Sequence, residues 1–200
     1  MTVQLGGSSR NLHYKFRLNH SKTSHIVQQF RSSLSAETGK GEETDMIRIT
    51  TRLSDHAVIS ALKSADKNAL LSAVAALAST HYGFSGEQAQ ESLVERERLG
   101  PTGFGGGTAI PHCKVDGIDG PVGVFVRLDK PIEYDAIDDE PVDLVFALFS
   151  PVNDGASHLK ALAEVSRMFR DEASRAQLRG AKDGDALYAL LAGFEERDAA

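Results

Sequence analysis

The chain has 200 residues, of which 41% are hydrophobic, and this is enough for one globular domain with a buried core. A net charge of −6 does not favour wholesale binding to nucleic acid or to an anionic membrane, so any anion must be bound locally. The single cysteine, Cys113, excludes an intramolecular disulfide, and no apolar run reaches membrane-spanning length. We therefore expect a cytoplasmic protein without membrane insertion.

The first 45 residues differ in composition from the rest of the chain. No acidic residue precedes Glu37, whereas basic residues are spread among Ser, His and Asn. This composition predicts a disordered basic extension, or translation from an upstream start with Met46 opening the domain. A transit peptide and a tail that binds nucleic acid or a partner remain open alternatives. The folded domain is expected over residues 46–200.

Two helices are expected at the start of this domain. Apolar residues at helical spacing over 70–78 predict a helix that follows Ser64 and stops at Gly83. A Ser-x-x-Gln capping signature opens a second helix over 85–100. Arg96 therefore lies in the last turn of the second helix.

A glycine-rich bend and three extended segments follow. The bend covers 102–107 and leads into an extended segment over 108–115, in which Pro111 predicts a sheet edge or a break. Alternation over 122–128 predicts a strand with two different faces. The apolar run over 144–149 predicts a central strand that is buried on both faces.

The C-terminal part of the chain is predicted to be helical. An acidic loop between Pro131 and Pro141 separates the two longer strands. Ser157 is a candidate N-cap for a helix that extends to Phe169, and Asp183 is a candidate cap for a last helix through Leu191. The order of elements predicts an α/β (α+β-like) fold with a mixed sheet flanked by helices.

The glycine bend does not match a nucleotide-binding motif. A dinucleotide fingerprint that starts at Gly103 requires a third glycine where the chain has Thr108, and no Gly-Lys-Ser/Thr ending is present. The bend also leads into an extended segment, whereas both nucleotide motifs open a helix. Two interpretations stay open: a plain turn, or a bend whose unhindered amides bind an anion.

Three side chains are candidates for chemistry. His112 follows Pro111, whose ring stiffens the backbone before the imidazole. His158 is placed just inside a helix start, where the helix dipole favours an anion over an imidazolium. Arg96 can bind phosphate oxygens through two N–H groups. Each of them alone is also compatible with a structural or solvent-exposed role.

Together these segments resemble a known family. Residues 96–112 read RERLGPTGFGGGTAIPH and closely resemble the signature of enzyme IIA of the mannitol/fructose phosphotransferase class, with the nitrogen-regulatory branch as the most similar group. The resemblance covers about residues 46–194 and includes 122–126, 135–138, 141–148 and 157–159. Many relatives have Ser at the position of Pro101 and Gly at the position of Cys113.

The resemblance implies a mannitol-type enzyme IIA fold and a role for each candidate residue. His112 corresponds to the histidine that accepts a phosphoryl group, while His158 and Arg96 correspond to supporting residues of a phosphotransferase component. Neither a cofactor nor a metal is implied. The expected anion cradle comprises Thr102, Gly103, Gly105, Gly106 and Gly107.

The resemblance also implies partners. The expected donor is a histidine phosphocarrier protein fed from phosphoenolpyruvate, and the expected targets include potassium transport and sensor-kinase proteins. Because no permease domain is fused to the chain, regulation is expected in preference to dedicated sugar import. A separate enzyme IIA component for a fructose- or mannitol-type transporter is the alternative.

Further alternatives concern the chemistry of the site. Cys113 next to Lys114 is a candidate redox modulator if its thiol is activated, and a passive apolar residue otherwise. A metal-dependent hydrolase would use His112, His158, Cys113 and Asp116, although no spaced ligand motif is present. A binding module in which His112 only packs is a third interpretation.

Overall fold

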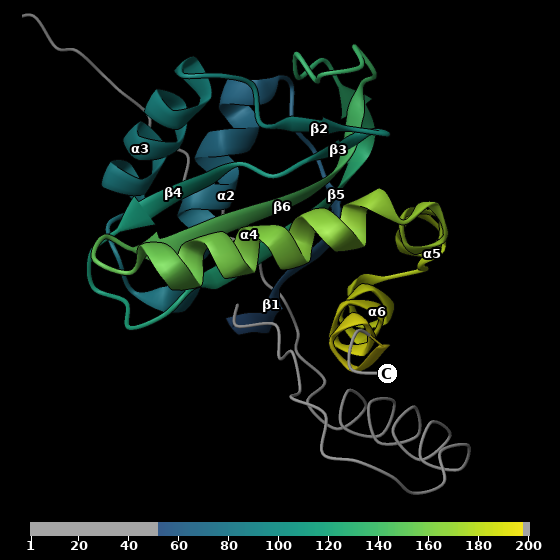
Figure 1. Ribbon diagram of the computed structural model, residues 1–200. Coiled ribbons are helices and arrows are strands. Elements are labelled where there is room, and N and C mark those ends of the chain that lie inside the picture. The colour runs from purple at the N-terminus through teal and green to yellow at the C-terminus, as the bar shows by residue number, and fades with distance from the viewer. Residues whose placement is uncertain (1–51, 198–200) are drawn as a thin grey trace, which may run out of the picture. The chain divides into compact units, whose positions relative to one another are not determined.

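A six-stranded mixed sheet runs through the centre of the fold in this computed structural model, which describes residues 52–197 (Figure 1). The predicted extension over residues 1–45 and the predicted start at Met46 lie outside the described residues. The strands are β1 (Arg52–Leu62), β2 (Gly103–Gly105), β3 (Thr108–Ala109), β4 (His112–Val115), β5 (Val122–Ile132) and β6 (Val142–Pro151).

Strand β6 is the central strand, as its sequence predicts. It pairs with β5 in antiparallel orientation on one side and with β3 and β4 in parallel orientation on the other. Strand β1 extends the sheet beyond β5, and β2 extends it beyond β3. The predicted break falls between β3 and β4 at the Ile110–Pro111 pair, so His112 begins β4 opposite Leu148 of β6.

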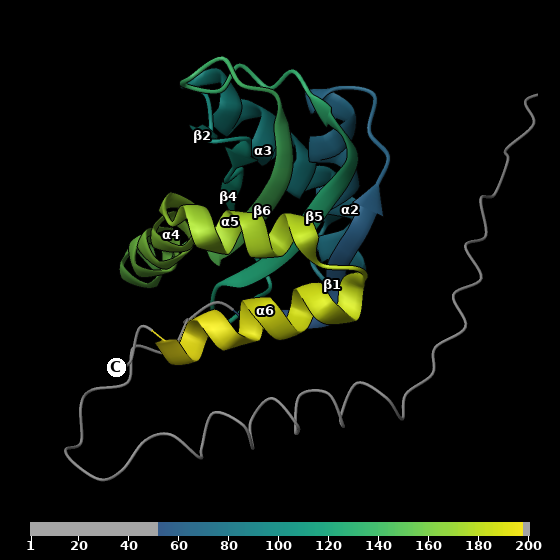
Figure 2. The same ribbon diagram turned by 90° about the vertical axis from the view of Figure 1, so that its right-hand side faces the viewer.

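Helices cover both faces of the sheet (Figures 1 and 2). Helices α2 (Lys67–Tyr82) and α3 (Gly86–Arg98) pack on one face. Helices α4 (Gly155–Arg170), α5 (Glu172–Gly180) and α6 (Gly184–Arg197) pack on the other face. No helix within residues 52–197 is both long enough and apolar enough to cross a membrane.

The two faces of β6 contribute to two hydrophobic cores. Val145, Ala147 and Phe149 are buried against α2 and α3, whereas Leu144 and Phe146 are buried with α4, α5 and α6. Successive side chains of a strand point to opposite faces, so a central strand that is covered on both sides favours apolar residues at consecutive positions. The apolar run over 144–149 is explained by this double burial.

The helix ends confirm some predicted caps and correct others. Gly83 ends α2 with a left-handed φ of 82°, and Ser85 caps α3 by accepting a hydrogen bond from the Gln88 amide. Helix α2, which was predicted to follow Ser64, has Asp66 as its N-cap, because the Asp66 carboxylate accepts from the amide of Ala69 at 2.8 Å.

The C-terminal helices also differ from the prediction. Helix α4 begins earlier than expected, because Asp154 and not Ser157 is its N-cap. Asp183 caps α6 as predicted, through a hydrogen bond from the amide of Ala186. Strand β1 and helix α5 are elements that the sequence patterns did not predict, and β5 continues through Pro131 to Ile132, into the expected loop.

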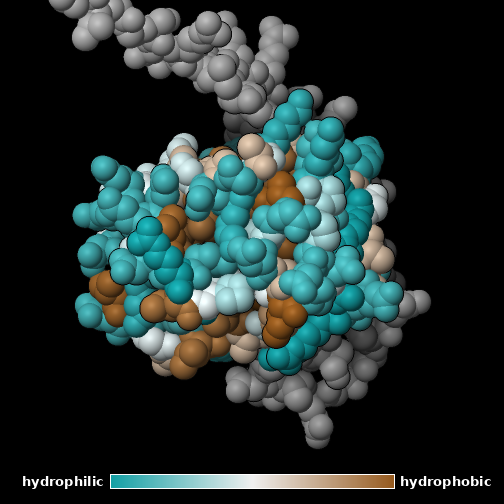
Figure 3. Space-filling model, turned by 90° about the horizontal axis from the view of Figure 1, so that it is seen from above, coloured by the Kyte–Doolittle hydropathy of each residue, from teal (hydrophilic) through white to brown (hydrophobic). Residues whose placement is uncertain are grey.

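Exposed hydrophobic side chains are few and scattered. In Figure 3, the end of the molecule that lies at the top of Figure 1 is mostly hydrophilic, with hydrophobic residues in several separate patches. The large exposed apolar residues of the described part are Leu99, Ile137, Val152 and Leu159.

Candidate active site

Arg96, His112 and His158 come together although they lie far apart in the sequence. Arg96 is in the last turn of α3, His112 is the first residue of β4, and His158 is in the first turn of α4. They line a cavity of about 400 Å³ together with Ser92, Glu95, Leu99, Cys113 and Lys114. Strand β6 brings His112 and His158 together, because it pairs with β4 and leads directly into α4.

Hydrogen bonds fix the ring of His112 and its tautomer. Nδ1 lies 2.8 Å from the carbonyl oxygen of Ile110. Since a carbonyl oxygen can only accept, Nδ1 carries the hydrogen and Nε2 presents its lone pair. Nε2 accepts a hydrogen bond from Nε of Arg96 at 3.0 Å.

The environment of His112 favours the neutral ring. Burial is the main cause that lowers its pKa below the ordinary value, and the positive charge of Arg96 lowers the pKa further, against an opposing contribution from the bond to Ile110. A neutral imidazole with a free lone pair is a nucleophile. The structure therefore presents Nε2 in its reactive form next to a guanidinium group.

Arg96 is held from two directions. Besides the bond to His112, its Nη1 donates to the carbonyl of Gly100 at 2.9 Å. The guanidinium has five N–H donors in a planar fork, so donors remain for oxygens of an anion in the cavity. This geometry suits a group that carries negative charge near Nε2 of His112.

His158 faces His112 across the cavity. The two ring centroids are 5.4 Å apart, and Nδ1 of His158 lies 2.9 Å from Oγ of the buried Ser150. Burial, followed by the charges of His112, Lys114 and Arg96, lowers the pKa of His158. His158 is the fourth residue of α4, further from the cap than the sequence predicted, yet still in the turn where the helix dipole favours anions.

The environment of Cys113 does not support a redox role. Its side chain is buried, and its Sγ donates to the carbonyl of Ala89 at 3.7 Å. Burial raises the pKa of the thiol to about 12. The thiolate that oxidation requires is therefore scarce at neutral pH, and the passive interpretation of Cys113 fits the structure.

The residues of the expected anion cradle make contacts with other parts of the protein. The five residues of that expectation are Thr102, Gly103, Gly105, Gly106 and Gly107, and the residues that line the cavity do not include them. The amide of Gly106 donates to the carboxylate of Asp138 at 2.7 Å, and the carbonyl of Gly106 accepts from Arg179. A Cβ on Gly103 would stand 2.5 Å from Cα of Ala136. The glycines therefore allow close packing against the β5–β6 connection, and their role as an anion cradle stays a prediction.

Thr102 has a different set of partners. Its side chain is buried, and its hydroxyl lies 2.5 Å from Oε2 of Glu97 and 3.1 Å from the hydroxyl of Tyr134. Glu97, and Ser150 behind His158, are residues of the site that the sequence patterns did not predict. In the sequence, the only feature that could have indicated a role for Glu97 in the site is its position next to Arg96.

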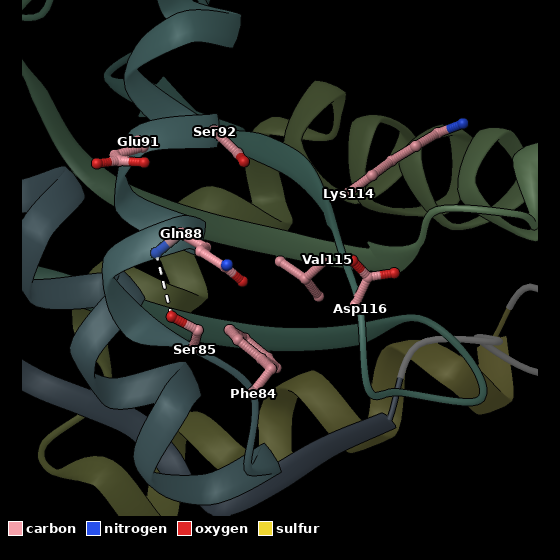
Figure 4. Close-up of a pocket in the computed structure, with 8 residues that line it drawn as sticks. All are labelled: Phe84, Ser85, Gln88, Glu91, Ser92, Lys114, Val115 and Asp116. Carbon is pink, nitrogen blue, oxygen red and sulfur yellow. Dashed lines mark hydrogen bonds between the residues drawn. The ribbon is translucent and has the colours of Figure 1, made fainter.

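A second hollow of about 250 Å³ adjoins the site (Figure 4). It shares Ser92 and Lys114 with the cavity but contains none of the three candidate residues. Asp116 lies here, while the side chains of Glu91 and Lys114 extend away from its centre. Within residues 52–197, no group of three or more His, Cys, Asp or Glu side chains is placed to hold a metal, so the hydrolase alternative has no ligand set.

Comparison with known proteins identifies the family. The model of the "Phosphoenolpyruvate-dependent sugar phosphotransferase system, EIIA 2" family matches residues 52–193. The chain belongs to this EIIA family. A nitrogen regulatory protein of Bradyrhizobium diazoefficiens is 42% identical over 144 residues, which cover 72% of this chain and 94% of that protein.

Two further comparisons support this assignment. The crystal structure of nitrogen regulatory protein IIA-Ntr from Neisseria meningitidis is 30% identical, with a TM-score of 0.66 over 70% of this chain and 95% of that one. The fructose-specific EIIA component of Haloferax volcanii is 36% identical over 106 residues, 53% of this chain and 69% of that protein. Nitrogen regulatory proteins are therefore among the relatives of this EIIA chain. The predicted mixed sheet flanked by helices is confirmed.

Proposed function

We propose that this EIIA protein is a phosphohistidine relay in which Nε2 of His112 accepts a phosphoryl group from a histidine phosphocarrier protein. One observation carries the proposal: the hydrogen bond from Nδ1 to Ile110 leaves Nε2 unprotonated, beside the guanidinium of Arg96 in an open cavity. The family assignment supports the same chemistry.

The transfer step follows from this geometry. The lone pair of Nε2 attacks phosphorus and forms a new N–P bond, while the N–P bond of the donor breaks and its electron pair returns to the donor imidazole. The hydrogen bond from Nδ1 of His112 to Ile110 persists and offsets the positive charge that develops on the attacking ring. The step as written requires no metal ion.

Arg96 and His158 stabilise the phosphoryl group in transit. The transition state of phosphoryl transfer is loose, with charge spread over the oxygens, so positioned donors and positive charge provide most of the catalysis. Arg96 turns N–H donors from Nε2 to these oxygens as the N–P bond forms. His158, oriented by Ser150, donates from the opposite side of the cavity.

The phosphorylated form would act as a regulatory signal in the cytoplasm. A phosphoryl group adds about two negative charges to the cavity and so changes which partners bind at its rim. The nitrogen regulatory proteins among the relatives support regulation as the output. The targets that we propose are potassium transport and sensor-kinase proteins.

A second candidate function is a separate EIIA component of a fructose- or mannitol-type transport system. The fructose-specific relative from Haloferax volcanii supports it. The distinction is whether the phosphorylated protein passes its phosphoryl group to an enzyme IIB domain of such a transporter. Rapid transfer to that domain favours the transport function.

The relay is tested by incubating the protein with phosphoenolpyruvate, enzyme I and the phosphocarrier, followed by measurement of acid-labile phosphate. We expect wild type to take up one phosphoryl group and His112→Ala to take up none. A wild type that stays unlabelled by a competent donor contradicts the proposal.

A further inference from the structure

Glu97 lies behind the active site, and hydrogen bonds connect it to both His112 and Arg96. It follows Arg96 in the last turn of α3, does not line the cavity, and has a side chain that is only 9% exposed. Its carboxylate accepts from the amide of Thr102 at 3.1 and 3.2 Å and from the Thr102 hydroxyl at 2.5 Å. One carboxylate thus holds both donors of Thr102.

The first connection leads from Glu97 to His112. The carbonyl of Thr102 accepts from the amide of Ile110 at 3.0 Å. The carbonyl of Ile110 in turn holds Nδ1 of His112 at 2.8 Å. A displacement of Thr102 would therefore move the carbonyl that orients the ring and fixes its tautomer.

The second connection leads from Glu97 to Arg96. The backbone carbonyl of Glu97 accepts from the amide of Gly100 at 3.2 Å, and the carbonyl of Gly100 accepts from Nη1 of Arg96 at 2.9 Å. Because the Glu97 side chain also holds Thr102, the turn from Glu97 to Thr102 is fixed at both ends. This turn sets the position of the carbonyl that holds the guanidinium.

Lys67 completes the arrangement from α2. Its Nζ lies 3.2 Å from Oε1 of Glu97, 2.6 Å from Asp135 and 4.9 Å above the ring centre of Tyr134. Only 19% of the Lys67 side chain is exposed, so its positive charge is close to a carboxylate that is largely removed from water. Two buried donors and one nearby cation offset the cost of burying the charge of Glu97.

We propose that Glu97 is a positioning residue that sets the geometry between Arg96 and His112 and keeps Nε2 of His112 in its reactive tautomer. Glu97 touches neither the phosphoryl group nor the reacting atoms, and it acts through Thr102, Ile110 and Gly100. This role rests on the proposed relay. It predicts a loss in the rate of transfer without a loss in docking of the donor.

The test compares Glu97→Gln with Glu91→Gln in the full chain. Glu91 lies on the same helix, is exposed and extends away from its hollow (Figure 4), so its substitution makes the same change in charge outside the network. A misplacement of about 1 Å costs on the order of 100-fold in rate. We expect E97Q to lower the maximal transfer rate roughly 10- to 100-fold, with the KM for the phosphocarrier unchanged, and E91Q to behave like wild type.

The ring of His112 supplies a second readout. NMR chemical shifts of its two ring nitrogens report which one carries the hydrogen. We expect the protonated Nδ1 signature in wild type and E91Q, and a mixture of tautomers in E97Q. An E97Q protein with the wild-type transfer rate and wild-type ring signals overturns the positioning role. An equal loss of transfer rate in E91Q, or a change in E97Q that is confined to KM, overturns it as well. All three outcomes leave the proposed relay intact.

A second pair of variants keeps the proposal testable if E97Q does not fold. Thr102→Val removes the hydroxyl at nearly constant volume, whereas Thr102→Ser retains it. We expect T102V to slow transfer and T102S to restore most of the rate, with both melting cooperatively. Equal rates in the two variants overturn the proposal, whereas an unlabelled wild type shows that the relay itself is wrong.

Discussion

Replacement of Arg96 tests whether the guanidinium supports transfer, as the hydrogen bonds from Nε to His112 and from Nη1 to Gly100 indicate. Arg96→Ala removes both bonds and the positive charge from the cavity. Loss of one preorganised donor to transition-state charge typically costs about 100- to 1000-fold in rate, or about 2.7–4 kcal/mol. We expect a loss of this order in Arg96→Ala. Arg96→Lys keeps the charge but loses the planar fork, so we expect an intermediate rate.

Arg98→Ala is the matched control, because Arg98 also lies in the last turn of α3 but does not line the cavity. Rates are followed by quenching the transfer reaction and measuring acid-labile phosphate, with the unfolding transition recorded for each variant. The charge of Arg96 is one cause of the lowered pKa of His112, so that pKa should rise in Arg96→Ala. Equal rates in the Arg96 and Arg98 variants would refute this reasoning.

Four further predictions concern other residues of the structure. Burial lowers the pKa of His112 below the ordinary value of about 6.5, so its neutral form persists as the pH falls. The rate of transfer, measured as a pH profile of labelling, should therefore decline only below pH 6.5, and a midpoint above pH 6.5 would contradict the lowered pKa. His158→Gln should slow labelling of His112 about 10-fold or more without abolishing it; quench kinetics that match wild type would remove His158 from the mechanism. The thiol of Cys113, with its pKa raised to about 12, should resist alkylation at pH 8 until the protein is unfolded, as followed by mass spectrometry, and rapid alkylation of the folded protein would disagree. Gly103→Ala places a Cβ 2.5 Å from Cα of Ala136 and should cost about 1–3 kcal/mol in urea unfolding, whereas unchanged stability would show that this packing relaxes freely.

Elements with strong local patterns were predictable from the sequence. The run over 144–149 predicted a buried central strand, and all six of its side chains are indeed buried, five of them in one of the two cores. Pro111 predicted the break before β4, and Gly83 the end of α2. Helix α5 was missed because it is short and mostly polar, and only Ser174 and Leu178 of its nine residues are buried, so few apolar residues mark it in the sequence.

Strand β1 and two helix caps were harder to predict. Asp55 and His56 interrupt the apolar pattern of β1 at an irregularity in its pairing with β5. At the start of α2, Ser64 and Asp66 are both residue types that cap helices, and in the folded chain it is Asp66 that accepts the free amide of Ala69. Asp154 replaces the predicted Ser157 for the same reason.

The candidate site shows a similar limit. Single residues could not separate a reactive His112 from a structural one, and the family resemblance supplied that distinction. The contacts of the glycine bend could not be predicted, because the partner of the Gly106 amide, Asp138, lies 32 residues further along the chain. Burial of Cys113 likewise depends on packing against α3, which its neighbours in the sequence do not reveal.

The most direct test of the relay is to identify the atom that carries the phosphoryl group. The protein is phosphorylated through the phosphoenolpyruvate cascade, kept at alkaline pH, and examined by NMR of the phosphohistidine and by mapping of the modified peptide. The arrangement of Ile110, His112 and Arg96 predicts a phosphoryl group on Nε2 of His112 and on no other residue. Phosphorylation at Nδ1, phosphorylation of a different residue, or full labelling of His112→Ala would contradict it.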